Sequence, residues 1–243
     1  MVVDVEGIII NTKNYGDTSR IIDIFTKEYG VIGVMAKGCK SMKSNLRSVT
    51  DKLTYAIFTI YYKKDKLSIL SEASVINNFS NIKKDIEKIS YASFLLDLTH
   101  QVYKQSEDNS LYDLLISALK KINDNFNPLI VTNIIELKYL EYLGVMPTLD
   151  GCTICGSKNV VTLSSDKGGY ICSKCHTDEP IVSDKAIKLV RMYTLVDINK
   201  ISKLDINKDV VFEVNRFIDD YYDRYTGLYL KSKSFLKNIN NVK

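Results

Sequence analysis

The pattern of hydrophobic and polar positions along the 243-residue chain changes near residue 77. Before that point the apolar residues form short runs rich in β-branched and aromatic side chains, separated by turn-forming pairs such as Gly16-Asp17 and Lys64-Asp65. The five runs read GIIIN, RIIDIFT, VIGVMAK, LTYAIFTIYY and LSILSEASVI. Because no long helical pattern interrupts them, residues 1–79 are predicted to form a small five-stranded barrel of the OB type, with part of a β-sandwich as the alternative.

Beyond residue 80 the apolar residues recur at the three- and four-residue spacing of helices that bury one face. The residues of the five stripes are Ile86, Ile89, Leu95, Leu96, Val102 and Tyr103; Leu111, Leu114, Leu115, Ala118, Leu119 and Ile122; Ile130, Val131, Ile134, Ile135, Leu137 and Leu140; Ile187, Val190 and Tyr193; and Val210, Val211, Val214, Phe217, Ile218 and Tyr221. Gly144, with Pro147 just beyond it, predicts the end of the third helix, and Ser183 is predicted to cap the fourth. We therefore expect a helical bundle interrupted by a compact insertion.

Four of the chain's five cysteines lie in that insertion, as two C-x-x-C pairs. Cys152 and Cys155 precede Gly156, and Cys172 and Cys175 follow a pair of glycines. This is the spacing of a zinc ribbon, in which each C-x-x-C turn directs two thiolates at one ion. Four thiolates complete the coordination of zinc, so the sequence predicts one structural zinc ion.

Other uses of these cysteines fit the sequence less well. A redox C-x-x-C pair opens a helix in a βαβ context, which neither pair has. A catalytic zinc ion keeps one coordination position open and has an acid or base nearby. His176 is an alternative ligand in place of Cys175. The remaining Cys39 and the helical His100 are interpreted as ordinary packed residues.

These patterns predict an α+β protein: an N-terminal OB-fold β-barrel followed by a helical domain with an inserted four-cysteine zinc ribbon. The predicted division is residues 1–79 for the barrel, 80–148 and 181–243 for the two parts of the helical domain, and 149–180 for the ribbon. The opening stretch MVVDVEGIIINTK contains the acidic residues Asp4 and Glu6, where a signal peptide is basic and then apolar, and no later stretch approaches membrane-spanning length. We therefore expect a soluble, cytoplasmic protein without membrane contacts, whose reduced thiols favour metal over disulfides.

The sequence carries no motif of a known catalytic class. It has no Walker-type phosphate loop, no dinucleotide-binding glycine motif and no G-x-S-x-G nucleophile elbow. With two histidines in the chain, at positions 100 and 176, an H-E-x-x-H zinc site is excluded. The acidic cluster at Asp219, Asp220 and Asp223 is interpreted as the solvated face of a helix. We therefore predict a binding protein rather than an enzyme.

The net charge of +4 is concentrated at the two ends of the chain, whereas residues 81–150 are acidic. The stretch AKGCKSMKSNLRS, residues 36–48, contains no acidic residue. Its basic residues are Lys37, Lys40, Lys43 and Arg47. Lysine and arginine bind nucleic-acid phosphates and release counterions, so this stretch is a candidate nucleic-acid contact, with a solvated surface loop as the alternative.

Two further groups of residues extend this interpretation. Tyr55, Tyr61 and Tyr62 are candidates for stacking on unpaired bases, with a place in the barrel core as the alternative. The C-terminal stretch YYDRYTGLYLKSKSFLKN adds a second set of basic residues: Arg224, Lys231, Lys233 and Lys237. Its aromatic residues are alternatively expected to dock onto the barrel.

Taken in this order, the motifs resemble the RecO family of recombinational repair mediators. The opening GIIINTKNYGDTSRIIDIFTKEYGVIGVMAKGCKSMKSNLRS resembles the barrel of that family, including the strand that ends in AKG and the loop rich in lysine and serine. The LGVMP that precedes the cysteines and the closing LKSKSFL resemble the family as well, so the similarity covers essentially the whole chain. The chain departs from the family at Thr50-Asp51-Lys52, where members often carry a proline-aromatic element.

The resemblance implies an N-terminal OB-fold, a helical domain and a zinc-finger element. It also implies a non-catalytic, nucleoid-associated protein that binds single- and double-stranded DNA and anneals complementary strands without ATP. The implied partners are RecR, the acidic C-terminal tail of single-strand-binding protein and, indirectly, RecA, which is loaded onto the coated strands. Because some relatives lack the four cysteines, the zinc ion is expected to be a scaffold rather than part of the mechanism.

The predicted DNA contacts are Arg20, Lys37, Lys40, Lys43, Arg47, Lys231 and Lys233, with Arg20 a weaker candidate than the four residues of the loop. The main alternative function is a protein-interaction adaptor whose basic loop is only soluble surface. An RNA-binding or transcription-associated zinc-ribbon protein would instead prefer structured RNA. A zinc hydrolase ranks last, because the four-cysteine site is expected to be closed.

Overall fold

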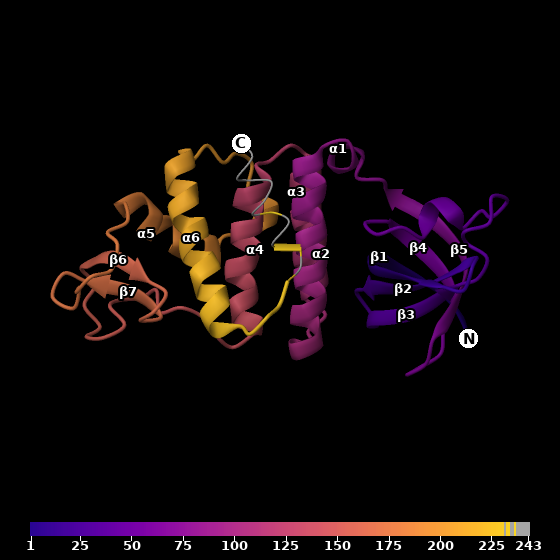
Figure 1. Cartoon of the computed structure of the whole chain (residues 1–243), viewed down its shortest axis with the longest axis horizontal. Helices are drawn as coiled ribbons and strands as arrows, with labels where there is room; N and C mark the ends of the chain where they lie inside the picture. Colours follow the sequence, from indigo (N-terminus) through magenta and orange to yellow (C-terminus); the bar gives the residue numbers. More distant parts are fainter. Residues whose placement is uncertain (231, 234–235, 237–243) are drawn as a thin grey trace. The chain divides into compact units, whose positions relative to one another are not determined.

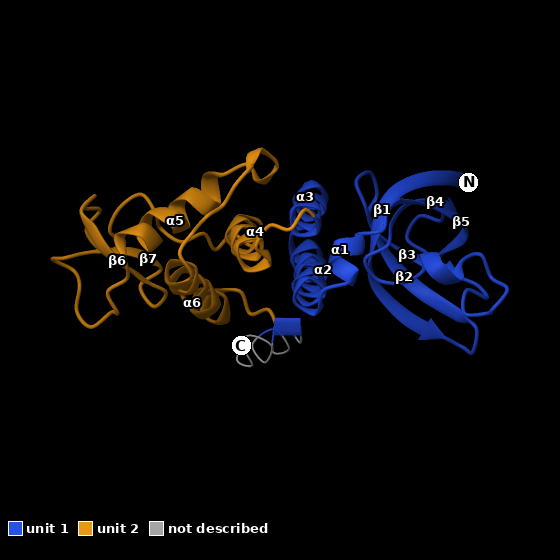
Figure 2. Cartoon of the chain, turned by 90° about the horizontal axis from the view of Figure 1, so that it is seen from above, with its two compact units in different colours: residues 1–123, 230–243 blue, residues 124–229 orange. Residues whose placement is uncertain are grey.

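A computed structural model of the chain describes residues 1–230, 232–233 and 236 (Figure 1). The described residues divide into two compact units, which Figure 2 distinguishes by colour. Unit 1 holds residues 1–123 together with the described end of the chain, and unit 2 holds residues 124–229. Within the described residues no helix is both long and apolar enough to cross a membrane.

Unit 1 begins with a closed barrel whose strands are ordered β1-β2-β3-β5-β4. The strands are β1 (Val2–Tyr15), β2 (Ser19–Thr26), β3 (Gly30–Ala36), β4 (Tyr55–Tyr61) and β5 (Ser68–Asn77). Strand β1 pairs antiparallel with β4 through residues 2–8 and with β2 through residues 7–15, and β3 closes the barrel by pairing parallel with β5. The predicted five-stranded, OB-like barrel is confirmed. Its first strand begins at Val2 rather than Gly7, because the residues before Gly7 pair with β4.

Alternation along the strands directs every second side chain into the barrel. The core residues are Val5, Ile9, Ile22, Ile24, Ile32, Val34, Ala36, Cys39, Ala56, Phe58, Ile60 and Leu70. Cys39 is 1% exposed, as expected for an ordinary packed residue. Tyr55 is also buried, and the ring of Tyr62 packs on Tyr29 with centroids 4.8 Å apart. Of the three tyrosines considered for base stacking, Tyr61 is therefore the most exposed. Tyr55 is buried, but it is not part of the barrel core: it alternates with the core residues Ala56 and Phe58 and so lies on the outer face of β4.

Three helices follow the barrel in unit 1: α1 (Ser80–Lys83), α2 (Ile86–Ser106) and α3 (Leu111–Asn123). Asp85 caps α2, because its side chain accepts hydrogen bonds from the backbone N–H groups of Glu87 and Lys88. The predicted stripes are largely buried, but Ile86, the first residue of the helix, is 69% exposed, so its assignment to the core was wrong. His100 lies half-buried on α2, and this burial lowers its pKa.

An aromatic cluster holds α2 and α3 against the barrel. The ring of Phe25, on β2, lies 5.0 Å from that of Tyr103 on α2 and 5.6 Å from that of Tyr112 on α3. The Tyr112 hydroxyl donates a 3.2 Å hydrogen bond to the Glu6 carboxylate of β1, which also accepts from the Tyr55 hydroxyl. Burial, followed by the Glu6 hydrogen bond, raises the pKa of Tyr55 to about 12. These contacts explain why the helices belong to the same compact unit as the strands, a grouping that the periodicity does not indicate.

Unit 2 contains the helices α4 (Pro128–Tyr142), α5 (Asp184–Leu195) and α6 (Lys208–Tyr225), with the cysteine-containing segment between α4 and α5. Helix α4 is almost entirely buried, including the polar side chains of Thr132, Asn133 and Glu136. The Tyr222 hydroxyl of α6 donates a 2.8 Å hydrogen bond to the Glu136 carbonyl oxygen, which ties α6 to α4.

The predicted helix boundaries in unit 2 are confirmed by their hydrogen bonds. The Ser183 hydroxyl oxygen accepts a 3.2 Å hydrogen bond from the Ala186 N–H, so Ser183 is the N-cap of α5. Glu213 of α6 accepts a 2.5 Å hydrogen bond from the same hydroxyl. At the other end of the insertion, α4 is capped at Leu143, and Gly144 follows with a φ of 69°.

The described part of the C-terminal stretch returns to unit 1. The Ser232 hydroxyl donates a 2.7 Å hydrogen bond to the Asp97 carboxylate of α2. Leu230 and Leu236 are buried. The Ser232 contact attaches this stretch to α2, in the unit to which residues from 230 onward belong.

Gly30 provides a test of how tightly the helices pack on the barrel. A Cβ atom at Gly30 would lie 1.8 Å from the Tyr103 hydroxyl oxygen, and φ is 62° at this residue. We expect Gly30→Ala to lower the free energy of unfolding by about 2–4 kcal/mol, because backbone strain adds to displacement of the packed Tyr103 ring. Urea unfolding followed by circular dichroism measures the loss.

Gly16→Ala is the matched control. Gly16 has a φ of 59°, but no other atom lies within 4 Å of the position that a Cβ atom would take there. This variant should lose only the strain of about 1–2 kcal/mol that a left-handed residue with a side chain carries. Equal losses in the two variants would show that Tyr103 does not constrain Gly30.

Candidate metal centre and nucleic-acid interface

The cysteine-containing segment folds around a two-stranded hairpin of β6 (Val160–Ser164) and β7 (Gly169–Cys172). Thr148, just after α4, lies against this hairpin: its N–H donates to the Gly168 carbonyl at 2.9 Å, and its own carbonyl accepts from the Tyr170 N–H at 3.0 Å. The approach is close enough that a Cβ atom at Gly169 would lie 2.3 Å from the Thr148 carbonyl oxygen. The Tyr170 hydroxyl donates a 2.6 Å hydrogen bond to the Ile187 carbonyl, which attaches the hairpin to α5.

The four cysteines converge at one point beside this hairpin. The sulfur atoms of Cys152, Cys155, Cys172 and Cys175 all lie within 4.8 Å of one another, and those of Cys155 and Cys172 are 3.5 Å apart. Tetrahedral zinc with Zn–S bonds of about 2.3 Å separates its sulfur ligands by roughly 3.8 Å. The cluster therefore fits a single tetrahedral metal ion. All five cysteines lie within the described residues, and none of them forms a disulfide.

The backbone around the first cysteine of each pair stabilises a thiolate. Burial acts to raise the pKa of Cys152, but the N–H groups of Cys155, Cys172 and Ile154 outweigh it and lower the pKa to about 6. The pKa of Cys172 is lowered in the same way, by N–H groups of Cys175 and Lys174 against the effect of burial. A hydrogen bond with the Cys155 thiol, together with burial, raises the pKa of Cys175 to about 12. Because four crowded thiols resist joint deprotonation, a divalent cation is needed to make all four anionic ligands.

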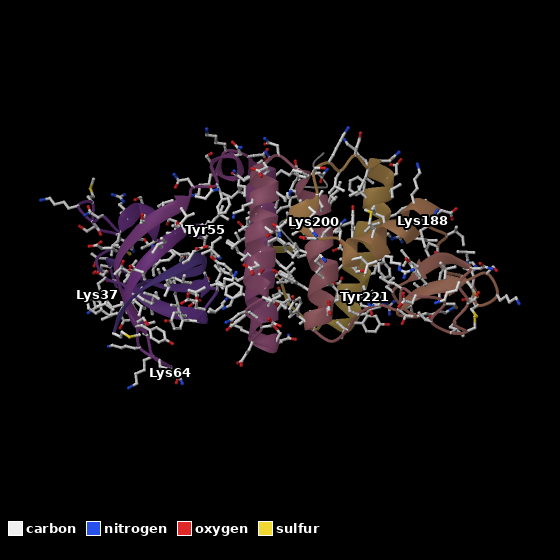
Figure 3. The ribbon with its side chains drawn as sticks, turned by 180° about the vertical axis from the view of Figure 1, so that it is seen from behind. Lys37, Tyr55, Lys64, Lys188, Lys200 and Tyr221 are labelled. Atoms are coloured by element: carbon white, nitrogen blue, oxygen red, sulfur yellow. The ribbon has the colours of Figure 1, made fainter. Side chains whose placement is uncertain are left out.

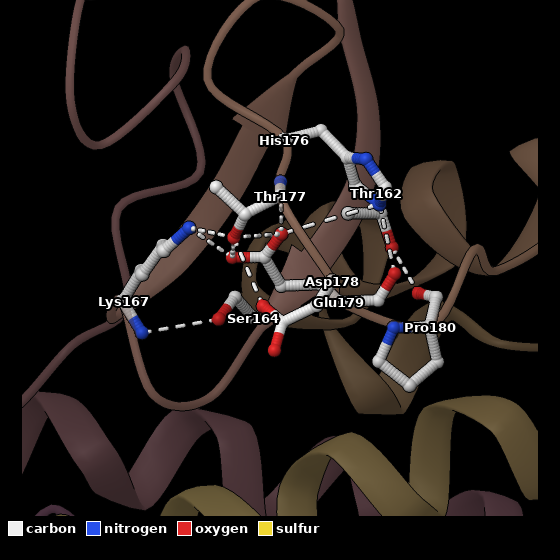
Figure 4. Close-up of polar contacts among 8 residues, drawn as sticks. All are labelled: Thr162, Ser164, Lys167, His176, Thr177, Asp178, Glu179 and Pro180. Carbon is white, nitrogen blue, oxygen red and sulfur yellow. Dashed lines mark hydrogen bonds and ion pairs between the residues drawn. The ribbon is translucent and has the colours of Figure 1, made fainter.

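His176 takes part in a polar network around Glu179 (Figure 4). Its Nε2 lies 2.8 Å from the Glu179 carbonyl oxygen. The Glu179 carboxylate pairs with the Lys167 ammonium and accepts a 3.0 Å hydrogen bond from the Thr177 N–H, and these two contacts lower the pKa of Glu179 to about 2. The network fixes the chain between the second cysteine pair and α5. The four-thiolate ligand set therefore fits the metal better than a set that includes His176.

The basic stretch after β3 forms a series of tight turns rather than an extended loop. The Gly38 N–H donates to the Ser19 hydroxyl oxygen at 3.1 Å, and the Lys40 N–H donates to the Thr18 carbonyl at 2.8 Å. The side chain of Cys39 is buried in the barrel core, and that of Leu46 packs against it. This segment, residues 37–47, is called the basic loop below. Its path is set by main-chain bonds and apolar anchors.

The cationic side chains of the basic loop point to solvent. Lys37, Lys43 and Arg47 are exposed, and Lys40 is partly exposed. Figure 3 shows Lys37 extending outward from the barrel. In the part of the chain that the structure describes, none of the four takes part in an ion pair. The barrel therefore carries four uncompensated positive charges on one short, well-anchored segment.

The remaining predicted DNA contacts lie in different environments. The Arg20 guanidinium is 2.6 Å from the Asp51 carboxylate and 3.2 Å from the Thr50 carbonyl oxygen, so it holds the segment that follows the basic loop. The ammonium nitrogen of Lys233 is buried. Lys231 lies outside the described residues. Neither Arg20 nor Lys233 is therefore exposed in the way that the loop cations are.

A second basic element was not among the predicted contacts. The turn between β4 and β5 reads Lys63-Lys64-Asp65-Lys66, and all of its residues are exposed (Lys64 is labelled in Figure 3). Its Lys63 and Lys66 border a hollow of about 370 Å³ that is also lined by the packed rings of Tyr29 and Tyr62. Three lysines within four residues of a predicted turn are the sequence signal that identifies it. Aromatic rings beside cations are a typical arrangement for binding single strands.

Comparisons with known proteins give a consistent result over the whole chain. The family described as "Recombination protein O N terminal" matches residues 1–79, and "Recombination protein O C terminal" matches residues 83–234. A protein named "DNA repair protein RecO" from Listeria monocytogenes serotype 4b (strain CLIP80459) is 34% identical, over 97% of this chain and 94% of its own. The protein of the same name from Bacillus pumilus (strain SAFR-032) is 32% identical, over 100% of this chain and 96% of its own.

The metal centre can be tested by measuring bound metal. Protein purified without added zinc should contain about one equivalent of zinc, and Cys172→Ser should lose most of it, because three thiolates bind zinc much more weakly than four. Elemental analysis of each protein gives the metal content. Chelation of the wild-type protein should also reduce the protection of residues 151–176 from proteolysis.

Two control variants locate the ligand set. Cys39→Ala and His176→Ala should keep the full zinc content, since Cys39 lies in the barrel core and His176 contacts Glu179. A zinc content that falls in His176→Ala but not in Cys175→Ser would identify the histidine as the fourth ligand instead.

Proposed function

The chain belongs to the RecO family of DNA repair proteins, and on this basis we propose that it binds single- and double-stranded DNA and anneals complementary strands without ATP. We further propose that, with RecR, it helps to load RecA onto strands coated by single-strand-binding protein. In this function the protein is a mediator that positions strands and partners, and it catalyses no bond-breaking step. The zinc ion, held by the four cysteines, stabilises the ribbon.

The observation that carries this proposal is the basic loop. Its four cations have no acidic partner among the described residues, and main-chain hydrogen bonds hold the loop in place. Because the backbone that carries these cations is already ordered, less conformational freedom is lost on binding phosphates than for a flexible segment. Counterions released from the DNA then supply a large part of the binding free energy.

The same charges explain how annealing can proceed without nucleotide hydrolysis. Two complementary strands repel each other through their phosphates, and a protein that neutralises some of these charges lowers the barrier to their encounter. The loop contacts would lie on the backbone of the strand, which leaves the base edges available for pairing. The turn at residues 63–66 and the adjacent tyrosine-lined hollow supply further cations and an aromatic surface on the same barrel.

Unit 2 contains a groove that suits the acidic tail of single-strand-binding protein. The groove has a volume of about 790 Å³ and lies between the ribbon and α5. Its apolar lining residues include Leu149, Ile187, Met192 and Leu195. Exposed Lys188 and Arg191 stand on its rim, where Arg191 is 2.9 Å from the Asp150 carboxylate. Lys158 also lines the groove, as do Asp150 and Asp184, so the cations outnumber the carboxylates by one. An apolar floor with an excess of cations is complementary to a peptide that combines apolar residues with carboxylates.

Annealing of coated strands is the experiment that tests the proposed function. Two complementary oligonucleotides are coated with the cognate single-strand-binding protein, with or without its acidic tail, and pairing is followed by fluorescence without ATP. We expect the protein to accelerate pairing, and to do so on coated strands only when the tail is present. No acceleration on coated or bare strands would favour the protein-interaction adaptor, and a preference for structured RNA would favour the RNA-binding alternative.

Charge reversal in the basic loop should weaken DNA binding. For Lys40→Glu combined with Lys43→Glu, we expect the slope of log K against log salt concentration for single strands to decrease by about 1.4, at roughly 0.7 for each phosphate that is no longer neutralised. Fluorescence anisotropy across a salt series measures this slope. The matched control is Lys83→Glu combined with Lys84→Glu, which makes the same charge change at exposed positions near α1. Equal effects of the two pairs would show that net charge, and not the loop, determines binding.

A substitution on the groove rim should separate tail binding from DNA binding. Lys188→Glu is expected to weaken binding of a labelled peptide of the acidic tail about tenfold, which corresponds to a loss of about 1.4 kcal/mol in binding free energy. The affinity for single-stranded DNA should stay unchanged. Lys185→Glu, an exposed neighbour on α5 that does not line the groove, is the control. If the peptide bound both variants as tightly as wild type, its site would lie elsewhere.

A further inference from the structure

Met42 stands at the tip of the basic loop with its side chain in solvent. It is 87% exposed, more than any other large hydrophobic side chain in the described part of the chain. Lys40 and Lys43 flank it in sequence, with Ser41 as the other neighbour. Single exposed apolar residues are common on proteins and need no explanation. Met42 differs from them because it lies between two lysines of a cationic segment.

The exposure of Met42 follows from the path of the loop. The Ser41 N–H donates to the Gly38 carbonyl at 3.1 Å, and the Ser44 N–H donates to the Ser41 carbonyl at 3.1 Å, so Met42 lies within two consecutive turns. On either side of these turns, Cys39 is buried in the barrel core and Leu46 packs against that core. The backbone therefore holds Met42 away from the barrel, and the side chain has no apolar surface of its own unit to cover it.

From this arrangement we propose that Met42 is an apolar wedge that inserts between two neighbouring bases of a bound single strand. The flanking ammonium groups of Lys40 and Lys43 hold phosphates of the same strand. Apolar side chains, methionine among them, insert between base steps in several DNA-binding proteins, and the polarisable thioether makes favourable contacts with aromatic rings. The inserted side chain would keep adjacent bases apart and interrupt self-structure in the strand, which prepares the bases for a complementary partner.

The wedge makes a different contribution from the cations. Contacts between lysine and phosphate release counterions and therefore depend strongly on salt, whereas an apolar contact with bases releases none. Removing the wedge should lower affinity without changing the slope of log K against log salt concentration. The inference rests on the proposed function, because it requires that the loop binds DNA.

The experiment compares Met42→Gln with wild type and with Met42→Leu. Glutamine has a similar length but a polar end, and leucine keeps an apolar side chain. The probe is an adenine-rich single strand with 2-aminopurine at one internal position, whose fluorescence increases when the base is unstacked. We expect binding of wild type and Met42→Leu to increase the fluorescence. For Met42→Gln at saturation we expect little increase, with an affinity about tenfold lower and an unchanged salt slope.

Ile86→Gln is the matched control, since Ile86 is 69% exposed in the same unit but lies on α2. It should behave as wild type in both measurements. Equal thermal stability of all variants, expected because the side chains are exposed, shows that folding is unaffected.

The outcomes separate the wedge from the proposed function. If Met42→Gln binds the strand with the same affinity as wild type and increases the fluorescence equally, the proposal that Met42 inserts between bases is wrong. The proposal that the loop binds DNA is then unaffected. If Met42→Gln instead changes the slope of log K against log salt concentration, the side chain acts by positioning the lysines. The proposal that it inserts between bases is then also wrong. If wild type does not bind single strands at all, the proposed function itself fails.

Discussion

Closure of the barrel depends on a single long strand, β1, which hydrogen-bonds to β4 through its first half and to β2 through its second. Because the sheet closes on itself, its hydrogen-bonding groups are paired around the ring and its connecting segments are held at fixed positions. The same strand carries Glu6, which accepts hydrogen bonds from Tyr55 and from Tyr112 of α3. Strand β1 thus closes the barrel and holds the helices of unit 1 against it. Through β2 and β3 it also supports the basic loop.

Unit 2 depends on a different local constraint, the convergence of four sulfur atoms. The metal centre does not line the groove between the ribbon and α5, yet it supports one wall of it, because Gly151 and Tyr170 lie in the ribbon and line the groove. The Tyr170 hydroxyl bonds to the Ile187 carbonyl of α5, on the opposite wall. The network around Glu179 then fixes the return of the chain to α5. A metal ion held by the four cysteines would therefore be coupled to the shape of the groove through the fold of the ribbon.

The periodicity of the sequence was sufficient to predict the five strands and the five long helices, and the spacing of the cysteines was sufficient to predict that all four would lie together, because each of these depends on local spacing. It failed where distant residues decide the outcome. Tyr55 and Tyr61 belong to the same predicted strand, but Tyr55 is buried because it meets Glu6, which also bonds to Tyr112 of α3. Arg20 and Lys233 are basic residues whose pairing or burial depends on the tertiary structure. The exposed turn at residues 63–66 was visible as a charge pattern next to Tyr62, but the second tyrosine beside it, Tyr29, comes from a distant part of the chain.

The way in which the basic loop is anchored has an evolutionary consequence. Its course is determined by the main chain and by Cys39 and Leu46, whereas its charged side chains form no ion pair with the described residues. Lineages can therefore gain or lose a positive charge at these positions without a loss of stability. Since each phosphate contact changes the salt dependence of binding, the loop offers a route for adapting the protein to the ionic composition of its cell.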